Sequence, residues 1–215
     1  AAELELVAQS VFEVLHVRVR QGKHAGVPEN DKRRGAPLEL RDELAARGHN
    51  FRTKSDTEVV LAAYAEWGVD CQYHFNGMWA FAVWDESKKS LFLSRDRFGV
   101  KPLFYLLDGV DLFFASELKA FRALRPSHRP GVDDAFVAAM SYVESATDTF
   151  LQGVKNLNAG HQLLLNASGE ARVEQWWRTS DHLMEVPRTF EEQGDLYREL
   201  FDNAVCIRTR SDVAL

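Results

Sequence analysis

Hydrophobic residues are densest near the middle of the chain, where residues 75–85 read FNGMWAFAVWD. In the second half of this run nearly every side chain before Asp85 is apolar, on both parities of the two-residue strand period. A strand of this kind cannot present either face to water, so it belongs in the middle of a layered structure. The pattern therefore predicts a central strand that is buried on both faces.

Further strands are predicted on the C-terminal side of this run. Short apolar segments separated by polar turns favour an antiparallel meander of hairpins. The predicted strands of this meander are residues 78–84, 90–94, 103–107 and 112–115. A second hairpin is predicted from residues 160–166 and 170–177. Trp176 and Trp177 end its second strand and cannot both face a core on a strand, so we expect them to pack at the domain edge.

The turn at residues 95–102 differs from the others because it is crowded with charge. Four charged side chains stand there beside a glycine and a proline: Arg95, Asp96, Arg97 and Lys101. A charged turn between two apolar strands is expected at the rim of a sheet, where chemistry or an interface is often found. We interpret it as a turn held by its own ion pairs, in preference to a direct catalytic role.

Helical periodicity flanks these strands on both sides. Apolar residues recur at helical spacing after Pro37, and Gly48 stands where a glycine typically ends a helix. Ser55 and Glu58 have the spacing of a capping box, in which each side chain accepts a hydrogen bond from a free backbone N–H at the start of a helix. That helix is predicted to end at Gly68. Further helices are predicted at residues 116–124, 132–142 and 189–207.

The beginning of the chain carries no chemical motif. Residues 1–20 mix apolar and polar positions in a way that suits a helix early and a strand late, and the alternative between helix and strand stays open. Residues 21–37 hold glycines and prolines among charges, which is typical of a loop or connector. We therefore divide the chain into a divergent N-terminal segment, residues 1–37, and a domain that spans residues 38–215.

Composition narrows the functional classes. The net charge of −6 and the pI near 5.7 give no electrostatic reason to expect a nucleic-acid partner. No apolar run approaches the roughly 20 residues that span a bilayer, so no membrane partner is expected. Cys71 and Cys206 have no metal-ligand or disulfide spacing, which fits a reducing cytoplasm, and we expect Cys206 to be an inert buried thiol. His49, His74 and His161 also stand without ligand-spaced partners, so no metal site is predicted.

Several long segments, in order along the chain, form a family pattern when they are taken together. They read LRDEL from Leu40, GHNFRTKSDTEV from Gly48, FNGMWAFAVWD from Phe75, SRDRFGVKPLFY from Ser94 and FASELKA from Phe114. Over about residues 38–215 the chain resembles the glutaminase domain of glutamine-hydrolysing asparagine synthetases. The resemblance implies a class II glutamine amidotransferase domain with the N-terminal-nucleophile hydrolase fold. That fold is α+β, a four-layer α/β/β/α sandwich of two antiparallel sheets, which we expect to be incomplete at the N-terminus.

The resemblance also implies the chemistry. In this family a cysteine at the start of the mature chain attacks glutamine, with its own α-amino group as the base. The released ammonia passes to a synthetase domain that uses ATP and Mg²⁺ to activate aspartate, and residues 210–213 resemble the linker to that domain. We therefore expect no cofactor in this chain. The implied partners are glutamine and a synthetase domain or subunit, and a homodimer is a further alternative.

The catalytic groups of the family are not recognisable in the sequence. Its first residue is Ala1, and residues 33–37 stand where the family has an Asn-Gly motif that builds the oxyanion hole. Asn76 and Gly77 belong to the later strand motif and are not assigned that role. Losing one oxyanion donor costs on the order of 100-fold in rate, and without the nucleophile no covalent route is left. We predict no catalytic residue in this chain and a glutaminase domain that is inactive as written.

Two other interpretations of the domain stay open. One is a non-catalytic scaffold, similar to the domain of β-lactam synthetases that has lost the cysteine and supports a separate ATP-using domain. The other is that residues 1–37 derive from a frame or gene boundary, and that the true start carries the cysteine.

Asp56 is the one substrate-binding residue that the resemblance supplies. In the family the aspartate of Ser-Asp-Thr-Glu binds the α-amino group of glutamine through a charge-assisted contact. The residues alone also allow Asp56 to favour the start of a helix through the helix dipole. Both roles can hold together, and we predict Asp56 as a glutamine contact.

Overall fold

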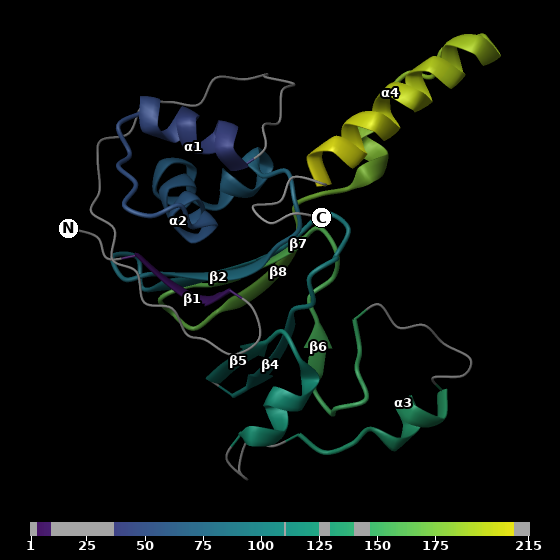
Figure 1. Cartoon of the computed structure of the whole chain (residues 1–215). Helices are drawn as coiled ribbons and strands as arrows, with labels where there is room; N and C mark the ends of the chain where they lie inside the picture. The colour runs from purple at the N-terminus through teal and green to yellow at the C-terminus, as the bar shows by residue number, and fades with distance from the viewer. Residues whose placement is uncertain (1–3, 10–36, 110, 125–129, 140–146, 209–215) are drawn as a thin grey trace. The chain divides into compact units, whose positions relative to one another are not determined.

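The computed structural model describes residues 4–9, 37–109, 111–124, 130–139 and 147–208 of the chain (Figure 1). The chain divides into two compact units, residues 1–178 and residues 179–215. The first unit contains two β-sheets and the helices that cover them, and the second contains the long helix α4 (Phe190–Arg208). The predictions for residues 10–36 and for the linker at residues 210–213 lie outside the described residues.

One sheet has five antiparallel strands in the order β1-β2-β3-β7-β8. These strands are β1 (Leu4–Gln9), β2 (Ala80–Asp85), β3 (Ser90–Arg95), β7 (His161–Leu165) and β8 (Ala171–Gln175). β1 pairs with β2, which decides the helix-or-strand alternative as strand over residues 4–9. In β2, Val83 packs in the cluster formed with the helices, while Ala82 packs toward the second sheet. β2 is therefore buried on both faces, as its apolar pattern predicted.

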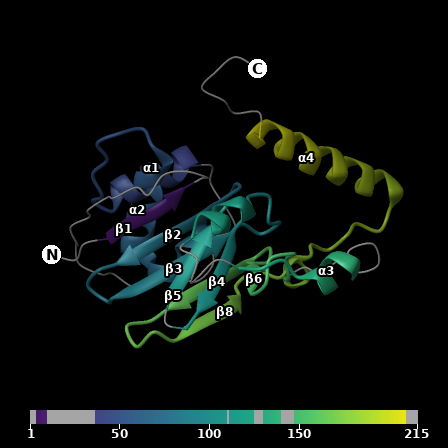
Figure 2. The same cartoon turned by 90° about the horizontal axis from the view of Figure 1, so that it is seen from below.

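The second sheet has three strands in the order β5-β4-β6. They are β4 (Phe104–Asp108), β5 (Asp111–Ala115) and β6 (Val154–Asn156). The predicted meander is wrong at one place, because β3 and β4 belong to different sheets. The two sheets pack face to face, with Leu93 of β3 and Tyr105 of β4 in one apolar cluster between them (Figures 1 and 2). Burial of apolar side chains between the layers replaces the edge-to-edge pairing that the short turns indicated.

Helices cover the outer face of the five-stranded sheet (Figure 1). The helices of this unit are α1 (Pro37–Ala46), α2 (Asp56–Trp67), η1 (Gly68–His74), η2 (Leu118–Ala123) and α3 (Asp134–Ala139), of which η1 and η2 are 3₁₀ helices. Leu44 of α1 lies in the same buried cluster as Phe92 of β3. Phe121 of η2 is buried with residues of the three-stranded sheet. The α+β sandwich of two antiparallel sheets that the family resemblance implied is confirmed.

The predicted helices agree with the structure at most positions. The helix predicted to follow Pro37 is confirmed as α1, which ends at Ala46 before Gly48, and the helix predicted at residues 189–207 is confirmed as α4. The segment 116–124 is the 3₁₀ helix η2. The predicted continuation of α3 to residue 142 lies outside the described residues. Among the described residues, no helix combines the length and the apolar character that a membrane crossing requires.

The second unit consists of the short 3₁₀ helix η3 (Thr179–His182) and α4. Tyr197 and Phe201 stack on one side of α4, with ring centroids 6.1 Å apart, and both are exposed. Cys206 is also exposed, so the expected buried thiol is wrong. The physical reason is that the described residues of its own unit, 179–208, place no core over the apolar side of α4.

Candidate functional site

Asp56, the predicted glutamine contact, is the first residue of α2, and its side chain is exposed. Ser55 precedes it as the N-cap, in extended backbone geometry with φ −70° and ψ 138°. The Ser55 hydroxyl oxygen accepts a hydrogen bond from the Thr57 N–H at 3.2 Å. A carboxylate in the first turn of a helix interacts favourably with the helix dipole. The predicted helix start is confirmed, and it presents the Asp56 side chain to solvent.

The α1–α2 loop, residues 47–55, carries the chain to Asp56. Glu58 of α2 holds the end of this loop, because its carboxylate accepts hydrogen bonds from the Arg52 N–H at 3.1 Å and from the Thr53 N–H and hydroxyl at 2.7 and 2.9 Å. The capping box is therefore wrong on this side, since Glu58 was expected to accept from the Ser55 N–H. That N–H donates instead to the Thr53 hydroxyl oxygen at 3.1 Å. The bend of the loop before Ser55 brings the earlier amides to the carboxylate.

These hydrogen bonds affect the ionisation of Glu58. Partial burial acts to raise its pKa, but the hydrogen bonds from Thr53 and Arg52 and the positive charge of Arg41 outweigh that effect. The pKa of Glu58 therefore lies below its ordinary value. The charged carboxylate is the form that accepts these hydrogen bonds, so the loop and the ionised side chain stabilise each other.

Arg41 of α1 holds the same loop from the other side. Its Nη1 donates to the Thr53 carbonyl oxygen at 2.7 Å, and its Nη2 donates to the Ser55 carbonyl oxygen at 2.9 Å. The guanidinium carbon also lies 4.5 Å from the centroid of the Phe51 ring, within the range of a cation–π contact. Sequence reasoning missed this role, because an arginine on an amphipathic helix is typical of any exposed face. We call Arg41 and Glu58 together the loop clamp.

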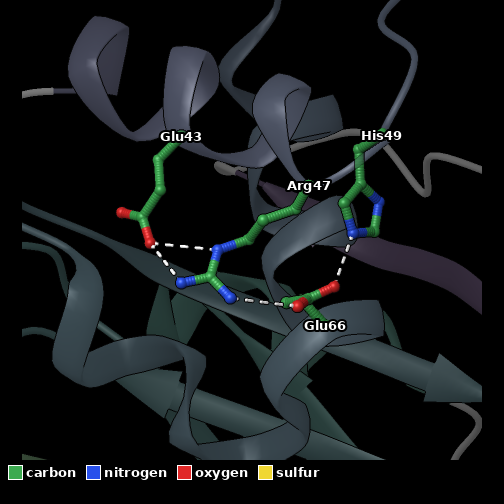
Figure 3. A network of polar contacts seen from close by, with 4 residues as sticks. All are labelled: Glu43, Arg47, His49 and Glu66. Atoms are coloured by element: carbon green, nitrogen blue, oxygen red, sulfur yellow. Dashed lines mark hydrogen bonds and ion pairs between the residues drawn. The ribbon is translucent and has the colours of Figure 1, made fainter. Parts of the chain in front are cut away.

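The start of the α1–α2 loop is held by a separate polar network (Figure 3). Arg47 lies between two carboxylates, with Nη2 2.9 Å from Glu43 Oε1 and Nη1 3.3 Å from Glu66 Oε1. His49 Nε2 lies 2.9 Å from the other oxygen of Glu66. The hydrogen bond from His49 is the main reason that the pKa of Glu66 lies below its ordinary value. Both ends of the loop that leads to Asp56 are therefore tied to helices.

The other histidines have structural surroundings. His74 is half-buried and stacks on Trp67 at 3.8 Å between ring centroids, and burial lowers its pKa. The Nδ1 atom of His161 lies 2.8 Å from the Ala159 carbonyl oxygen. Within the described ranges, no group of three histidine, cysteine, aspartate or glutamate residues is placed to hold a metal ion.

The β3–β4 loop, residues 96–103, crosses from one sheet to the other. Asp96 at its start is only 1% exposed. Its Oδ1 accepts hydrogen bonds from the N–H groups of Phe98 and Val100 at 3.1 and 3.0 Å, and its Oδ2 accepts from those of Lys101 and Trp79 at 3.0 and 3.3 Å. The Asp96 carboxylate accepts hydrogen bonds from four backbone N–H groups, so its role is to hold the shape of this loop.

Arg95, at the end of β3, holds the same loop and is 8% exposed. Its guanidinium donates to the carbonyl oxygens of Gly99 and Lys101, both at 2.7 Å. It also donates to the Leu157 carbonyl at 2.6 Å and the Asn156 side-chain oxygen at 2.7 Å. Burial lowers the pKa of Arg95, while nearby Asp96 acts in the opposite direction. The prediction of a turn held by its own ion pairs is wrong for these two residues, because the hydrogen bonds of Arg95 and Asp96 go mainly to backbone groups.

Arg97, the third charge of this segment, lies among tryptophan rings. Its guanidinium carbon is 4.5 Å from the Trp177 ring centroid, 5.5 Å from that of Trp176 and 5.7 Å from that of Trp79. Its Nη1 donates to the Phe75 carbonyl oxygen at 2.6 Å. The arrangement ties the β3–β4 loop to the segment that precedes β2.

Trp176 and Trp177 are both buried, each 7% exposed. The expectation that they pack at the domain edge is therefore wrong. β8 ends at Gln175, so the alternation of a strand no longer applies to the two tryptophans. The backbone N–H groups of the two tryptophans both donate to the Gly160 carbonyl oxygen, at 2.9 and 3.1 Å. This shared acceptor lets both rings turn inward.

Neither cysteine is placed as a nucleophile in the described structure. Cys71 in η1 is fully buried, and burial raises the pKa of its thiol far above the ordinary value. A thiol that is neutral and inaccessible can neither attack a substrate nor bind one. Cys206 is exposed but lies in α4, in the second unit.

Comparison with known proteins identifies the domain. A family model described as a glutamine amidotransferase domain matches residues 37–177. The asparagine synthetase [glutamine-hydrolyzing] 3 of Bacillus subtilis (strain 168) is 39% identical over 180 residues, which cover 81% of this chain and 28% of the relative. The asparagine synthetase [glutamine-hydrolyzing] 2 of the same organism is 35% identical over 192 residues, covering 80% of this chain and 25% of the relative.

The solved structures include an amidotransferase as well. The glutamine phosphoribosylpyrophosphate amidotransferase of B. subtilis, complexed with ADP and GMP, covers 82% of this chain and 28% of its own, with a TM-score of 0.44 and 18% identity. The chain thus spans about a quarter of the length of the asparagine synthetases that it matches. The family model covers most of the first unit, and the two sequence relatives exceed 30% identity. The chain belongs to the class II glutamine amidotransferase domain family, as its motifs predicted.

Proposed function

We propose that this chain is the glutaminase-type domain of an asparagine synthetase-like protein, and that it binds glutamine through Asp56. The support comes from the family, from the names of the relatives and from the exposed position of Asp56. In this proposal the family's role of such a domain is to supply ammonia from glutamine for the amidation of aspartate by a synthetase domain or subunit, which would bind ATP and Mg²⁺. The chain itself would need no cofactor, and its proposed location is the cytoplasm.

The observation that carries the proposal is the Asp56 side chain, which is exposed at a helix start on a loop tied at both ends. The α-ammonium group of glutamine is a charged donor, and a carboxylate is a matching acceptor. Such charge-assisted hydrogen bonds are short, about 2.8 Å, and roughly twice as strong as neutral ones. Capping of α2 by Ser55 leaves the Asp56 carboxylate available for this contact.

Hydrolysis of glutamine needs a nucleophile, and neither Cys71 nor Cys206 is suited to the task. We therefore propose that the chain, as its sequence stands, binds glutamine without hydrolysing it. Incubation of the purified chain with glutamine should release no more ammonia than a heat-denatured sample. Turnover that survives further purification would contradict this part of the proposal.

The role of Asp56 is tested by calorimetric titration with glutamine. Asp56→Asn keeps the size of the side chain and removes its charge, and we expect the affinity to fall about tenfold or more, since a charged hydrogen bond contributes roughly 1.5–3 kcal/mol. Asp42→Asn is the matched control, because Asp42 is also exposed but lies on α1. Equal affinities of the Asp56 variant and the unsubstituted chain, or no binding at millimolar glutamine, would contradict the proposal.

A second candidate function is a non-catalytic scaffold for a separate ATP-using domain. The observation that favours it is the β3–β4 loop, which is held by buried Arg95 and Asp96 yet exposes Phe98 and Val100, 66% and 54% accessible. Exposed apolar side chains on a rigid loop are suited to contact with another protein surface.

The two candidates differ in what they require of Asp56. A binding assay can use the asparagine synthetase [glutamine-hydrolyzing] 3 of Bacillus subtilis. The part of that protein outside the matched region is produced separately and immobilised. The scaffold function predicts that Phe98→Ser with Val100→Ser abolishes capture of this chain, while Asp56→Asn leaves capture unchanged. Absence of capture by the unsubstituted chain would count against the scaffold function.

A further inference from the structure

We infer that Arg41 and Glu58 are positioning residues that set the place and direction of Asp56 for the α-ammonium group of glutamine. This inference rests on the proposed function, in which Asp56 is the acceptor for that group. The inference adds two residues to the proposed site, and neither of them needs to contact the ligand. Their partners are the backbone groups of the α1–α2 loop just before Asp56.

The loop clamp forms hydrogen bonds with both the backbone carbonyl and the backbone N–H of Thr53. Arg41 Nη1 donates to the Thr53 carbonyl oxygen at 2.7 Å. The Glu58 carboxylate accepts from the Thr53 N–H at 2.7 Å and from the Thr53 hydroxyl at 2.9 Å. The two clamp residues come from different helices, Arg41 from α1 and Glu58 from α2. The loop is therefore held between the helices and cannot slide relative to either of them without breaking charged hydrogen bonds.

The clamp also reaches the peptide unit that enters Asp56. The Ser55 carbonyl, which accepts from Arg41 Nη2 at 2.9 Å, belongs to the peptide plane shared by Ser55 and Asp56. On the other side of Asp56, the Thr57 N–H donates to the Ser55 hydroxyl at 3.2 Å. The backbone on both sides of Asp56 is fixed, while the Asp56 side chain itself is exposed. This is the arrangement expected of a side chain held ready for a ligand.

A purely structural role explains this arrangement less well. Ion pairs and hydrogen bonds at exposed positions contribute little to stability, and Thr53 and Ser55 are both exposed. In contrast, a displacement of about 1 Å in a ligand-binding group can cost on the order of 100-fold in function. An arginine is suited to this task, because its planar fork holds two acceptors in a fixed geometry, whereas the single ammonium group of a lysine imposes no such geometry.

The test compares two ligands across a set of variants by calorimetry. One ligand is L-glutamine, and the other is 4-carbamoylbutanoate, which is glutamine without its α-amino group. Arg41→Ala should weaken binding of glutamine about tenfold and leave binding of the analogue within about twofold, because only glutamine uses Asp56. Arg41→Lys should fall between, since lysine can keep one of the two carbonyl contacts. Lys54→Ala is the charge control, because Lys54 is an exposed cation of the same loop outside the clamp.

The outcomes separate the inference from the function on which it rests. If Asp56→Asn removes the preference for glutamine and Arg41→Ala keeps it, the positioning role is wrong and the proposed function stands. If the unsubstituted chain binds both ligands alike, or binds neither, the proposed function is wrong. If Arg41→Ala weakens both ligands equally, the effect is general loss of structure and the inference fails.

A measurement without ligand tests the clamp itself. Hydrogen exchange of the Thr53 amide should accelerate about tenfold in Arg41→Ala and in Glu58→Gln, because its hydrogen bond belongs to the clamp. The Phe92 amide in β3 should keep its protection in both variants, which shows that the sandwich is still folded. Unchanged exchange at Thr53 would overturn the inference whatever the binding data show.

Discussion

The α1–α2 loop and the β3–β4 loop are held by the same chemistry at different depths. In each, one arginine donates to backbone carbonyls and one carboxylate accepts from backbone N–H groups. Arg41 and Glu58 do this for the first loop, and Arg95 and Asp96 do it for the second. The second pair is almost fully buried, whereas the first is partly open to solvent.

The difference in depth separates architecture from binding. A buried charged group that loses its hydrogen-bond partners cannot replace them with water. The β3–β4 loop therefore keeps one conformation where it connects the two sheets. The α1–α2 loop is held by hydrogen bonds that lie nearer to solvent, and it ends at an exposed carboxylate. A site for a small charged ligand is expected on a loop of the α1–α2 kind. The candidate binding residue is therefore Asp56 and not a residue of the charged β3–β4 loop.

The strongest test of this comparison is Arg95→Met. The substitution leaves the carbonyls of Gly99, Lys101 and Leu157 without their buried donor, and we expect the free energy of unfolding to fall by about 3 kcal/mol or more. Urea denaturation followed by tryptophan fluorescence measures it. Arg172→Met, an exposed arginine on β8, is the control and should cost less than about 0.5 kcal/mol. A loss below about 1 kcal/mol for Arg95→Met would show that burial does not separate the two loops.

A smaller effect is expected at Gly99, which has a φ of +64°. A Cβ there would lie 3.1 Å from Arg95 Cζ and 3.1 Å from Ala159 Cβ, so Gly99→Ala combines left-handed strain with contacts so tight that the neighbouring side chains must shift. We expect a loss of about 2 kcal/mol. Gly109→Ala is a matched control, because Gly109 has a φ of +63° and nothing within 4 Å of such a Cβ. Equal losses in the two variants would mean that the packing of Arg95 tolerates the added methyl group.

Local patterns predicted the parts of this fold that depend on neighbouring residues. The double burial of β2 follows from apolar residues on both strand parities, and the cap at Ser55 follows from a polar residue before an apolar helix. The assignment of β4 to a second sheet could not be predicted in this way. It depends on Leu93 and Tyr105 meeting across the layers, and a short turn is compatible with either arrangement.

The candidate site divides along the same line. Asp56 was reached through the family motif, whereas Arg41 was not, because its acceptors are backbone carbonyls that carry no residue type. Arg95 and Asp96 were predicted to hold their turn through ion pairs for the same reason. Charge in a sequence indicates a polar partner but does not say whether that partner is water, an opposite charge or the backbone. Only the folded chain answers that question.

The smallest predicted effect concerns the pH dependence of the exposed clamp. The folded pKa of Glu58 lies below its ordinary value, so its contribution to stability is present above the unfolded pKa, about 4.3. It is lost as the pH falls through the lowered folded pKa. The difference in free energy of unfolding between the unsubstituted chain and Glu58→Gln should therefore be largest near neutral pH, at less than about 1 kcal/mol for a partly exposed group, and should shrink toward pH 3. Subtracting the two urea titrations at each pH cancels the contributions of Asp85 and Glu66, whose pKa values are also lowered. A difference that is constant with pH would mean that the loop is held by Arg41 alone, and the likeness between the two loops would then be limited to their arginines.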